Sequence, residues 1–170
     1  GDLLLRLTVL LGQVAEGRQV FPTLSVAENL EMGALLPRAR AGRAKNLDHV
    51  FALFPVLSER MGQAAGTLSG GEQQMLAIGR CLMGAPDLVM FDEPAGGLSV
   101  EETRTLGDLI LRIHGLTGAQ TLVIDHDVDL INHICAETLV LDFGRRIAFG
   151  PTADVLADPK VKAAYLGVEA

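Results

Sequence analysis

Cysteine is nearly absent from this chain of 170 residues, which contains only Cys81 and Cys135. Two cysteines so far apart form neither a disulfide framework nor the paired spacing of a zinc site. Tryptophan is absent and aromatic residues make up only 4% of the sequence, so a core must be built mainly from Leu, Val, Ile and Ala. These absences favour a domain from a reducing cytosol over a small secreted scaffold.

Long hydrophobic runs are also missing. The most apolar stretch, LLLRLTVLLG at residues 3–12, is interrupted by Arg6 and is shorter than the roughly 20 residues that span a bilayer. It has no basic leader and no small-residue cleavage site, so we expect neither a membrane span nor a signal peptide. Basic residues are in the minority, and the net charge of −7 argues against a nucleic-acid-binding surface.

The pattern that is present changes character along the chain. Residues 24–66 predict a block of helices, whereas the segment after it alternates strands and helices, which is typical of a mostly parallel sheet flanked by helices. Residues 1–15 fit a helix or a strand equally well. The expected segments are a loop at 16–25, a mobile basic connection at 37–46, helices near 70–84, 100–115 and 128–136, strands at 87–91 and 120–125, a hairpin at 137–150, and short helices after 151.

The stretch TLSGGEQQ at residues 67–74 predicts a helix start with unusual chemistry. Ser69 and Glu72 have the spacing of a capping box, which alone requires no glycine. Gly70 and Gly71 leave the first-turn N–H groups unshielded, and these groups combine with the positive end of the helix dipole to favour an anion. The stretch therefore suggests a phosphate contact, with a simple helix cap as the alternative.

Two apolar strands downstream end in ionisable residues. LVMFDE delivers Asp92 and Glu93 at a strand end, where carboxylates serve phosphoryl transfer by holding Mg²⁺ and orienting water. TLVIDH ends in His126 among acidic residues, and by itself such a histidine is more simply a turn residue.

The order of these segments resembles the ATP-binding cassette (ABC) ATPases. LSGGEQQ resembles the signature motif, LVMFDEP the Walker B strand, AGGLS the D-loop, and the later DH the switch histidine. Finer detail, in EGRQVFPTLSVAENL and VLDFGRRIAFGPTADVLADPKVKAAYLG, is similar to the cassettes of branched-chain amino acid importers. The resemblance implies a P-loop NTPase-like α/β fold with an inserted helical subdomain at 24–66, a motif-bearing core at 67–150 and C-terminal helices at 151–170.

The same resemblance implies a site shared by two chains. Two ATP molecules with Mg²⁺ would lie between two head-to-tail cassettes, each taking its signature from the opposite chain. By resemblance, the nucleotide of a partner would be contacted by Ser69, Gly70, Gly71 and Gln73. On the chain's own side, Asp92 would hold Mg²⁺ through water and Glu93 would polarise the attacking water. His126 would contact the γ-phosphate, and Glu16 would stand where the family often has Gln. Membrane-spanning permease subunits would dock on the helical block and the preceding loop, at the inner face of the cell membrane, and no nucleic acid is expected.

One expected motif is missing from these residues. No GxxxxGK followed by Ser or Thr occurs, and Lys45, the only lysine before Ser69, does not follow a strand. We therefore expect a cassette without the N-terminal part of its fold that does not hydrolyse ATP alone.

Several interpretations stay open. The chain could be a fragment or degenerate form of an importer ATPase subunit, a non-catalytic subunit that lends its signature to a complete cassette, a chromosome-maintenance ATPase of the same head fold, or a piece without independent function. The DFG at residues 142–144 matches the kinase tripeptide, but no other kinase motif accompanies it.

Overall fold

The computed structural model describes residues 10–17 and 19–166. It divides into two compact units, with the boundary between Ile124 and Asp125. None of the helices in these residues is both long and apolar enough to cross a lipid bilayer.

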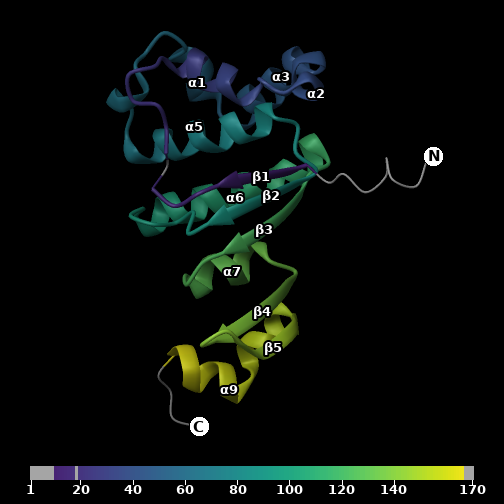
Figure 1. Ribbon diagram of the computed structural model, residues 1–170. Coiled ribbons are helices and arrows are strands. Elements are labelled where there is room, and N and C mark those ends of the chain that lie inside the picture. Colours follow the sequence, from purple (N-terminus) through teal and green to yellow (C-terminus); the bar gives the residue numbers. More distant parts are fainter. Residues whose placement is uncertain (1–9, 18, 167–170) are drawn as a thin grey trace, which may run out of the picture. The chain divides into compact units, whose positions relative to one another are not determined.

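The first unit is built on a three-stranded parallel sheet (Figure 1). Strands β1 (Leu11–Val14), β2 (Leu88–Asp92) and β3 (Gln120–Ile124) lie in the order β1-β2-β3. Val14 pairs with Phe91 and Asp92 pairs with Ile124, so the carboxyl ends of the three strands meet at one edge. That edge is where the sequence places its candidate acidic residues.

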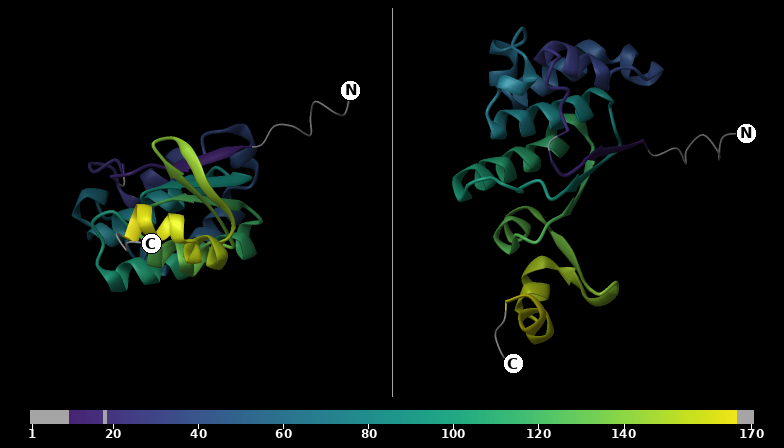
Figure 2. Two further views of the ribbon diagram at one scale, coloured as in Figure 1. Left: turned by 90° about the horizontal axis from the view of Figure 1, so that it is seen from below. Right: turned by 60° about the vertical axis from the view of Figure 1, so that its left-hand side comes forward.

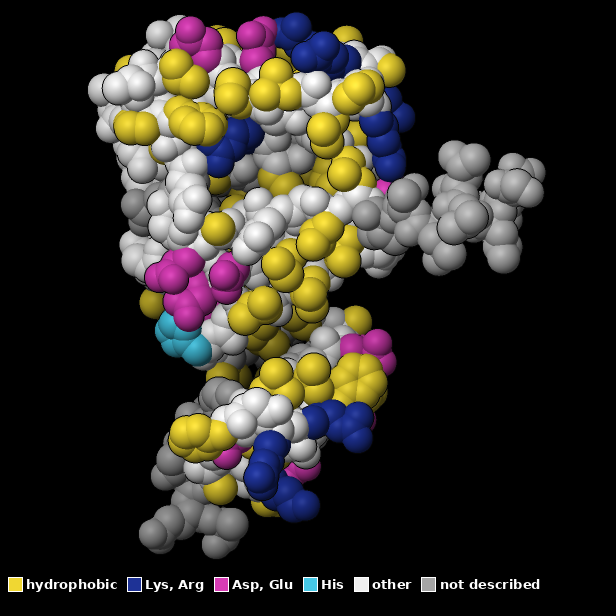
Figure 3. Space-filling view, in the orientation of Figure 1, with side chains coloured by type: hydrophobic (Ala, Val, Ile, Leu, Met, Phe, Trp, Pro, Cys, Tyr) yellow, Lys and Arg dark blue, Asp and Glu magenta, His cyan; other side chains and the backbone are white. Residues whose placement is uncertain are grey.

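One face of this sheet is covered and the other is bare within the described residues. Helix α5 (Gly70–Met83) contacts β1, and helix α6 (Val100–Thr117) contacts β3. Val89 and Phe91 are fully buried, whereas Leu122 and Ile124 are 48% and 50% exposed. Hydrophobic side chains accordingly gather on the visible surface of the sheet (Figure 3). Parallel sheets are usually covered on both faces, so this surface is unusual.

A block of helices packs on α5. Its elements are α1 (Val26–Gly33), α2 (Pro37–Ala41), α3 (Arg43–Leu53), α4 (Pro55–Glu59) and the 3₁₀ turn η1 (Ala65–Thr67). Figure 1 and the right-hand view of Figure 2 both place α5 between α1–α3 and the sheet. The helical block expected at 24–66 is therefore present, and Pro55 separates α3 from α4 as its position predicts.

The interpretation of residues 37–46 as a mobile connection is wrong. Pro37 starts α2 at its first turn, where its missing N–H costs nothing, and α3 begins at Arg43. The segment is held from outside as well, because the guanidinium of Arg38 donates to both carboxylate oxygens of Asp87, at 3.0 and 2.7 Å. The basic residues thus lie on ordered helices.

The second unit is a hairpin with helices on it. It contains α7 (Val128–Ile134), β4 (Glu137–Asp142), β5 (Arg145–Pro151), α8 (Thr152–Ala157), α9 (Pro159–Val161) and the π-helical turn η2 (Lys162–Leu166). Val140, Val155 and Val161 form its small core. Phe143 and Gly144 both have positive φ, which makes the tight turn that the sequence predicts here.

Candidate functional site

Acidic residues gather at the carboxyl edge of the β1-β2-β3 sheet. Asp92 is the last residue of β2, and Glu93 follows it directly. Glu16 is exposed and lies in the turn two residues after the end of β1, the strand that pairs with β2. Because parallel strands end at the same edge, this is the position at which open α/β sheets bind ligands.

The backbone of Glu93 is strained. Its φ is +44°, a left-handed conformation that few residues other than glycine adopt. The conformation is held from both sides: the N–H of Glu93 donates to the carbonyl of Ile124 at 2.8 Å, and the N–H of Gly96 donates to the carbonyl of Glu93 at 3.1 Å. Strain of this kind clusters at functional sites.

Asp92 offers an open carboxylate. In the described part of the chain no hydrogen bond or ion pair involves this side chain, which is partly exposed. Among residues 10–17 and 19–166, no group of three or more His, Cys, Asp or Glu side chains is placed to hold a metal ion. A cation at Asp92 would therefore need most of its ligands from water or phosphate, which is how Mg²⁺ is commonly bound.

The amino end of α5 forms as the sequence predicts. The N–H of Glu72 donates to Ser69 Oγ at 3.3 Å, and the N–H of Ser69 donates to Glu72 Oε2 at 2.8 Å, completing a capping box. A Cβ built on Gly71 would lie 3.5 Å from Glu102 Oε1 at the start of α6. The glycine start is therefore next to a carboxylate that sequence reasoning did not single out.

Gln73 and Glu72 are engaged locally. Gln73 Nε2 donates to the carbonyl of Leu68 at 3.1 Å, and Arg60 Nη2 lies 3.2 Å from Glu72 Oε1. These contacts fix the first turn of α5, and they leave the carbonyl oxygen of Gln73 and the second N–H of its Nε2 available for a ligand.

His126 belongs to the second unit, two residues after β3. Its ring is 76% exposed, and its Nδ1 lies 3.8 Å from Asp125 Oδ1. The side chain of Asp125 is only 2% exposed, and its Oδ1 accepts a hydrogen bond from the N–H of Asp127 at 2.9 Å. The turn thus presents an exposed imidazole beside a fixed carboxylate.

Comparison with known proteins gives two family matches. The profile described as ABC transporter matches residues 6–96, more than half of the chain, and the profile described as branched-chain amino acid ATP-binding cassette transporter matches residues 145–170. Two relatives come from Pseudomonas aeruginosa. The high-affinity branched-chain amino acid transport ATP-binding protein BraG is 41% identical over 156 residues, or 91% of this chain and 65% of that protein. The corresponding protein BraF is 38% identical over 111 residues, or 65% of this chain and 44% of that protein.

A solved structure has the same fold. An ATP-binding cassette of an ABC transporter in its ADP conformation superposes with a TM-score of 0.76 at 26% identity, over 93% of this chain and 68% of that one. The chain spans about two thirds of the length of BraG, 65%. The likeness therefore extends over nearly all of these residues but only part of the relatives.

Proposed function

Because the chain belongs to the ABC transporter family, we propose that it is part of the ATP-binding subunit of an importer for branched-chain amino acids. In that subunit ATP hydrolysis would drive transport. The observation that carries the proposal is the presence on one chain of the glycine start of α5 and of the acidic tip of β2, with Glu93 held in a left-handed conformation. The names of BraG and BraF support the choice of cargo.

The residues of the β2 tip fit a magnesium nucleotide. Bound Mg²⁺ would neutralise charge on the phosphates, and the open carboxylate of Asp92 would hold it through water. Glu93, directed by its strained backbone, would orient and polarise the attacking water. As the family resemblance implies, His126 would contact the γ-phosphate.

The amino end of α5 would serve the nucleotide of a second cassette. Its first-turn N–H groups and the Ser69 hydroxyl, with Gly70 and Gly71 offering no side chain in the way, suit a phosphate held by a partner chain. Gln73 would add a polar contact to that nucleotide. Glu16, which stands where the family often has Gln, would instead contact Mg²⁺ or its water at the acidic edge of its own sheet. These 170 residues contain no P-loop lysine, so we propose that they do not hydrolyse ATP alone and that α5 completes the site of a full cassette.

The partner on the other side would be a membrane-spanning subunit. The helical block at 24–66 and the loop before it would receive a segment of that subunit, which places the protein at the inner face of the membrane. A chromosome-maintenance ATPase is the weaker alternative, because residues 145–170 match the branched-chain transporter profile.

Mixing with full-length BraG from Pseudomonas aeruginosa tests the proposal. The chain alone should hydrolyse ATP no faster than its Glu93→Gln variant. In excess over BraG it should form mixed dimers that retain one complete site, so substantial hydrolysis persists. With Ser69→Arg in the chain, that remaining hydrolysis should fall at least tenfold, because the long arginine side chain would occupy the space where the phosphate should lie.

Ser58→Arg is the matched control. Ser58 is exposed on α4, and among the described residues its hydroxyl bonds only the local carbonyl of Pro55, at 2.7 Å. Equal rates in mixtures with the Ser69→Arg and Ser58→Arg chains would overturn the role of α5. A Glu93-dependent rate for the chain alone would overturn the claim that it is inactive by itself.

A further inference from the structure

The hairpin of the second unit ends in an unusual turn. Phe143 and Gly144 connect β4 to β5, and their φ angles are +44° and +76°. Two-residue turns of this kind favour Asn, Asp or Gly, because a bulky side chain is strained at positive φ. The DFG tripeptide of the sequence therefore forms a hairpin turn with a strained aromatic residue at its tip.

The Phe143 ring has no packing role in the part of the chain that the structure describes. The residue is 100% exposed, whereas the small core of its unit is formed by Val140, Val155 and Val161. Both views of Figure 2 show the turn projecting beyond α8 and α9 of the same unit. A residue that is strained and buries no apolar surface points to a partner outside the chain.

Two arginines follow this turn. Arg145 and Arg146 begin β5, are exposed, and form no ion pair within residues 10–17 and 19–166. Because neighbouring residues of a strand point to opposite faces, their guanidinium groups flank the tip on both sides. Asp142 is the register partner of Arg145 and offsets one charge, so the tip keeps a net positive charge in a chain whose total is −7.

A projecting apolar tip with positive charge on both sides fits the surface of an anionic lipid bilayer. Aromatic rings are favourable at the depth of the lipid headgroups, and basic residues beside them attract anionic lipids. A protein that covered one face of the hairpin would leave the arginine of the other face outside the contact. A flat charged surface that meets the tip uses both arginines at once.

We infer that the tip of the β4–β5 hairpin, residues 142–146, inserts the Phe143 ring among the headgroups of an anionic bilayer. This surface differs from those proposed above for the nucleotide and for the membrane-spanning subunit, so the inference goes beyond the proposed function. One ring and two arginines bind lipid weakly by themselves. The contact gains strength when other subunits already hold the protein at the membrane, because the local concentration of lipid is then high.

An introduced tryptophan tests the insertion directly. The chain contains no tryptophan, so Phe143→Trp places a single indole at the tip. Vesicles made from an equal mixture of phosphatidylglycerol and phosphatidylcholine should shift its fluorescence to shorter wavelength and protect it from quenching by acrylamide. Vesicles of phosphatidylcholine alone should have a much smaller effect. High salt should also reduce the shift, because it screens the arginines.

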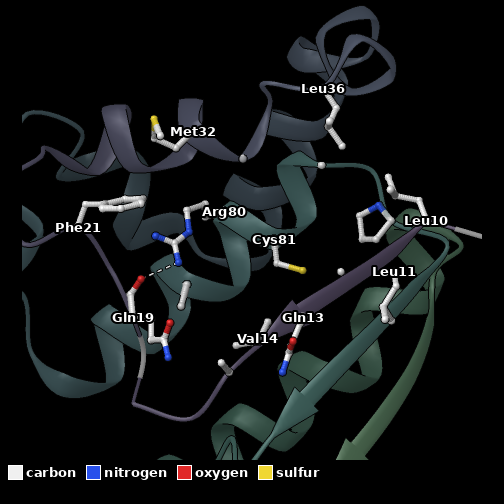
Figure 4. Close-up of a pocket in the computed structure, with 16 residues that line it drawn as sticks. Leu10, Leu11, Gln13, Val14, Gln19, Phe21, Met32, Leu36, Arg80 and Cys81 are labelled. Carbon is white, nitrogen blue, oxygen red and sulfur yellow. Dashed lines mark hydrogen bonds between the residues drawn. The ribbon is translucent and has the colours of Figure 1, made fainter.

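Phe21→Trp is the matched control. Phe21 is 43% exposed and also lies beside an arginine, because the guanidinium carbon of Arg80 is 4.9 Å from the centre of its ring. It lines a pocket between β1, α1 and α5 in the first unit and is no part of the hairpin (Figure 4). The fluorescence of this variant should not change with either kind of vesicle. Equal shifts in the two tryptophan variants would mean general adsorption and would overturn the inference.

Two kinds of substitution separate lipid binding from folding. Phe143→Asn should raise the free energy of unfolding, because Asn tolerates positive φ, and should weaken binding to the mixed vesicles about tenfold or more. Co-sedimentation with the vesicles measures this binding without a fluorophore. Arg145→Gln and Arg146→Gln should each weaken binding about fivefold. Lipid binding and stability thus change in opposite directions for Phe143→Asn, which a general loss of folding cannot produce.

The remaining outcomes all count against the inference. Binding that is unchanged by Phe143→Asn, or equally strong on phosphatidylcholine alone, would overturn it. An indole at position 143 whose emission no vesicle changes would also overturn it, and would favour a protein partner on the exposed face with Leu139 and Phe149, which pair directly across the hairpin. Each of these results leaves the proposed function standing, because ATP hydrolysis in mixtures with BraG tests that function without lipid.

Discussion

The backbone N–H of Glu93 donates a 2.8 Å hydrogen bond to the carbonyl of Ile124 and thereby joins the tip of β2 to the end of β3. The last residue pair of the two strands is Asp92 with Ile124, and this bond holds the next residue, Glu93, against β3. Glu93 itself has a left-handed backbone conformation. The carboxylate proposed to act on water is thus set by the sheet and not by a flexible loop.

Glu93→Gly should raise the free energy of unfolding by up to about 1 kcal/mol, because glycine adopts a left-handed φ without strain. Glu93→Val should lower it by about 1–2 kcal/mol, since branching at Cβ is least tolerated there. Urea titration measures both. Ala85→Gly is a matched control, because Ala85 also has positive φ, +50°, and lies outside the acidic edge. If Glu93→Gly and Ala85→Gly both lowered the free energy of unfolding, the backbone strain inferred from positive φ would be contradicted.

Ser69→Asp separates helix capping from phosphate contact. Aspartate caps helices about as well as serine, so stability should change by less than about 0.5 kcal/mol, whereas Ser69→Ala should cost about 1 kcal/mol. In mixtures with BraG, however, Ser69→Asp should remove the remaining ATP hydrolysis, because it places a carboxylate where phosphate should lie. Ser25→Asp, at the equivalent capping box of α1, should leave that hydrolysis unchanged. Loss of hydrolysis in both aspartate variants would point to a general effect.

Gly33→Ala should destabilise the first unit by more than about 2 kcal/mol, because the new methyl group would overlap the backbone of α5. Gly115→Ala is the opposite case: nothing lies within 4 Å of its Cβ position on α6, so it should stabilise by about 0.5–1 kcal/mol. Thermal unfolding followed by circular dichroism distinguishes the two. A gain in stability for Gly33→Ala would refute the close contact of α1 with α5.

Asp87 should make stability depend on pH. The side-chain hydrogen bond from Arg38, and then the backbone N–H of Leu10, hold the pKa of this carboxyl below its ordinary value. A lowered folded-state pKa contributes stability above the unfolded value of about 4 that is lost as pH falls through the folded value. The free energy of unfolding of the wild-type chain should therefore exceed that of the Asp87→Asn variant at pH 6, and this difference should shrink steadily below pH 4.

Urea titrations at pH 6, 4 and 2.5 measure this dependence. Arg38→Gln removes the main cause of the lowered pKa, so the advantage of Asp87 over Asn should depend less on pH in that background. A difference between wild type and Asp87→Asn that stayed constant from pH 6 to 2.5 would rule out the linkage.

Local signals in the sequence predicted much of the fold. Capping pairs such as Ser25 with Glu28 and Ser69 with Glu72 mark helix starts by a bond between neighbours in sequence, so they are readable without a structure. Pro55 and Gly144 punctuate the chain in the same local way. Strand β2, an apolar run with acids at its end, and the parallel arrangement of its neighbours also follow from pattern.

The rest depended on contacts between distant residues. Residues 37–46 are polar and rich in arginine, and their contacts with distant parts of the chain, such as that of Arg38 with Asp87, 49 positions away, cannot be read from neighbouring residues. Residues 1–15 were ambiguous between helix and strand because β1 is defined by its pairing with β2, and residues 1–9 lie outside the described residues. The left-handed Glu93 left no signal in sequence. Neither did the buried Nη1 of Arg80, which has no hydrogen-bond partner in the part of the chain that the structure describes. Each results from where neighbouring elements hold the backbone or the side chain.

The bare face of the β1-β2-β3 sheet has a consequence for work with this polypeptide in isolation. Within the described residues β3 pairs only with β2, so its second edge offers unused N–H and carbonyl groups next to Leu122 and Ile124. Two molecules that pair along such a strand form new backbone hydrogen bonds and bury apolar surface, so the protein is prone to aggregate at high concentration during purification. Storage at low concentration, or a lysine at position 122, would keep molecules apart without touching the acidic edge.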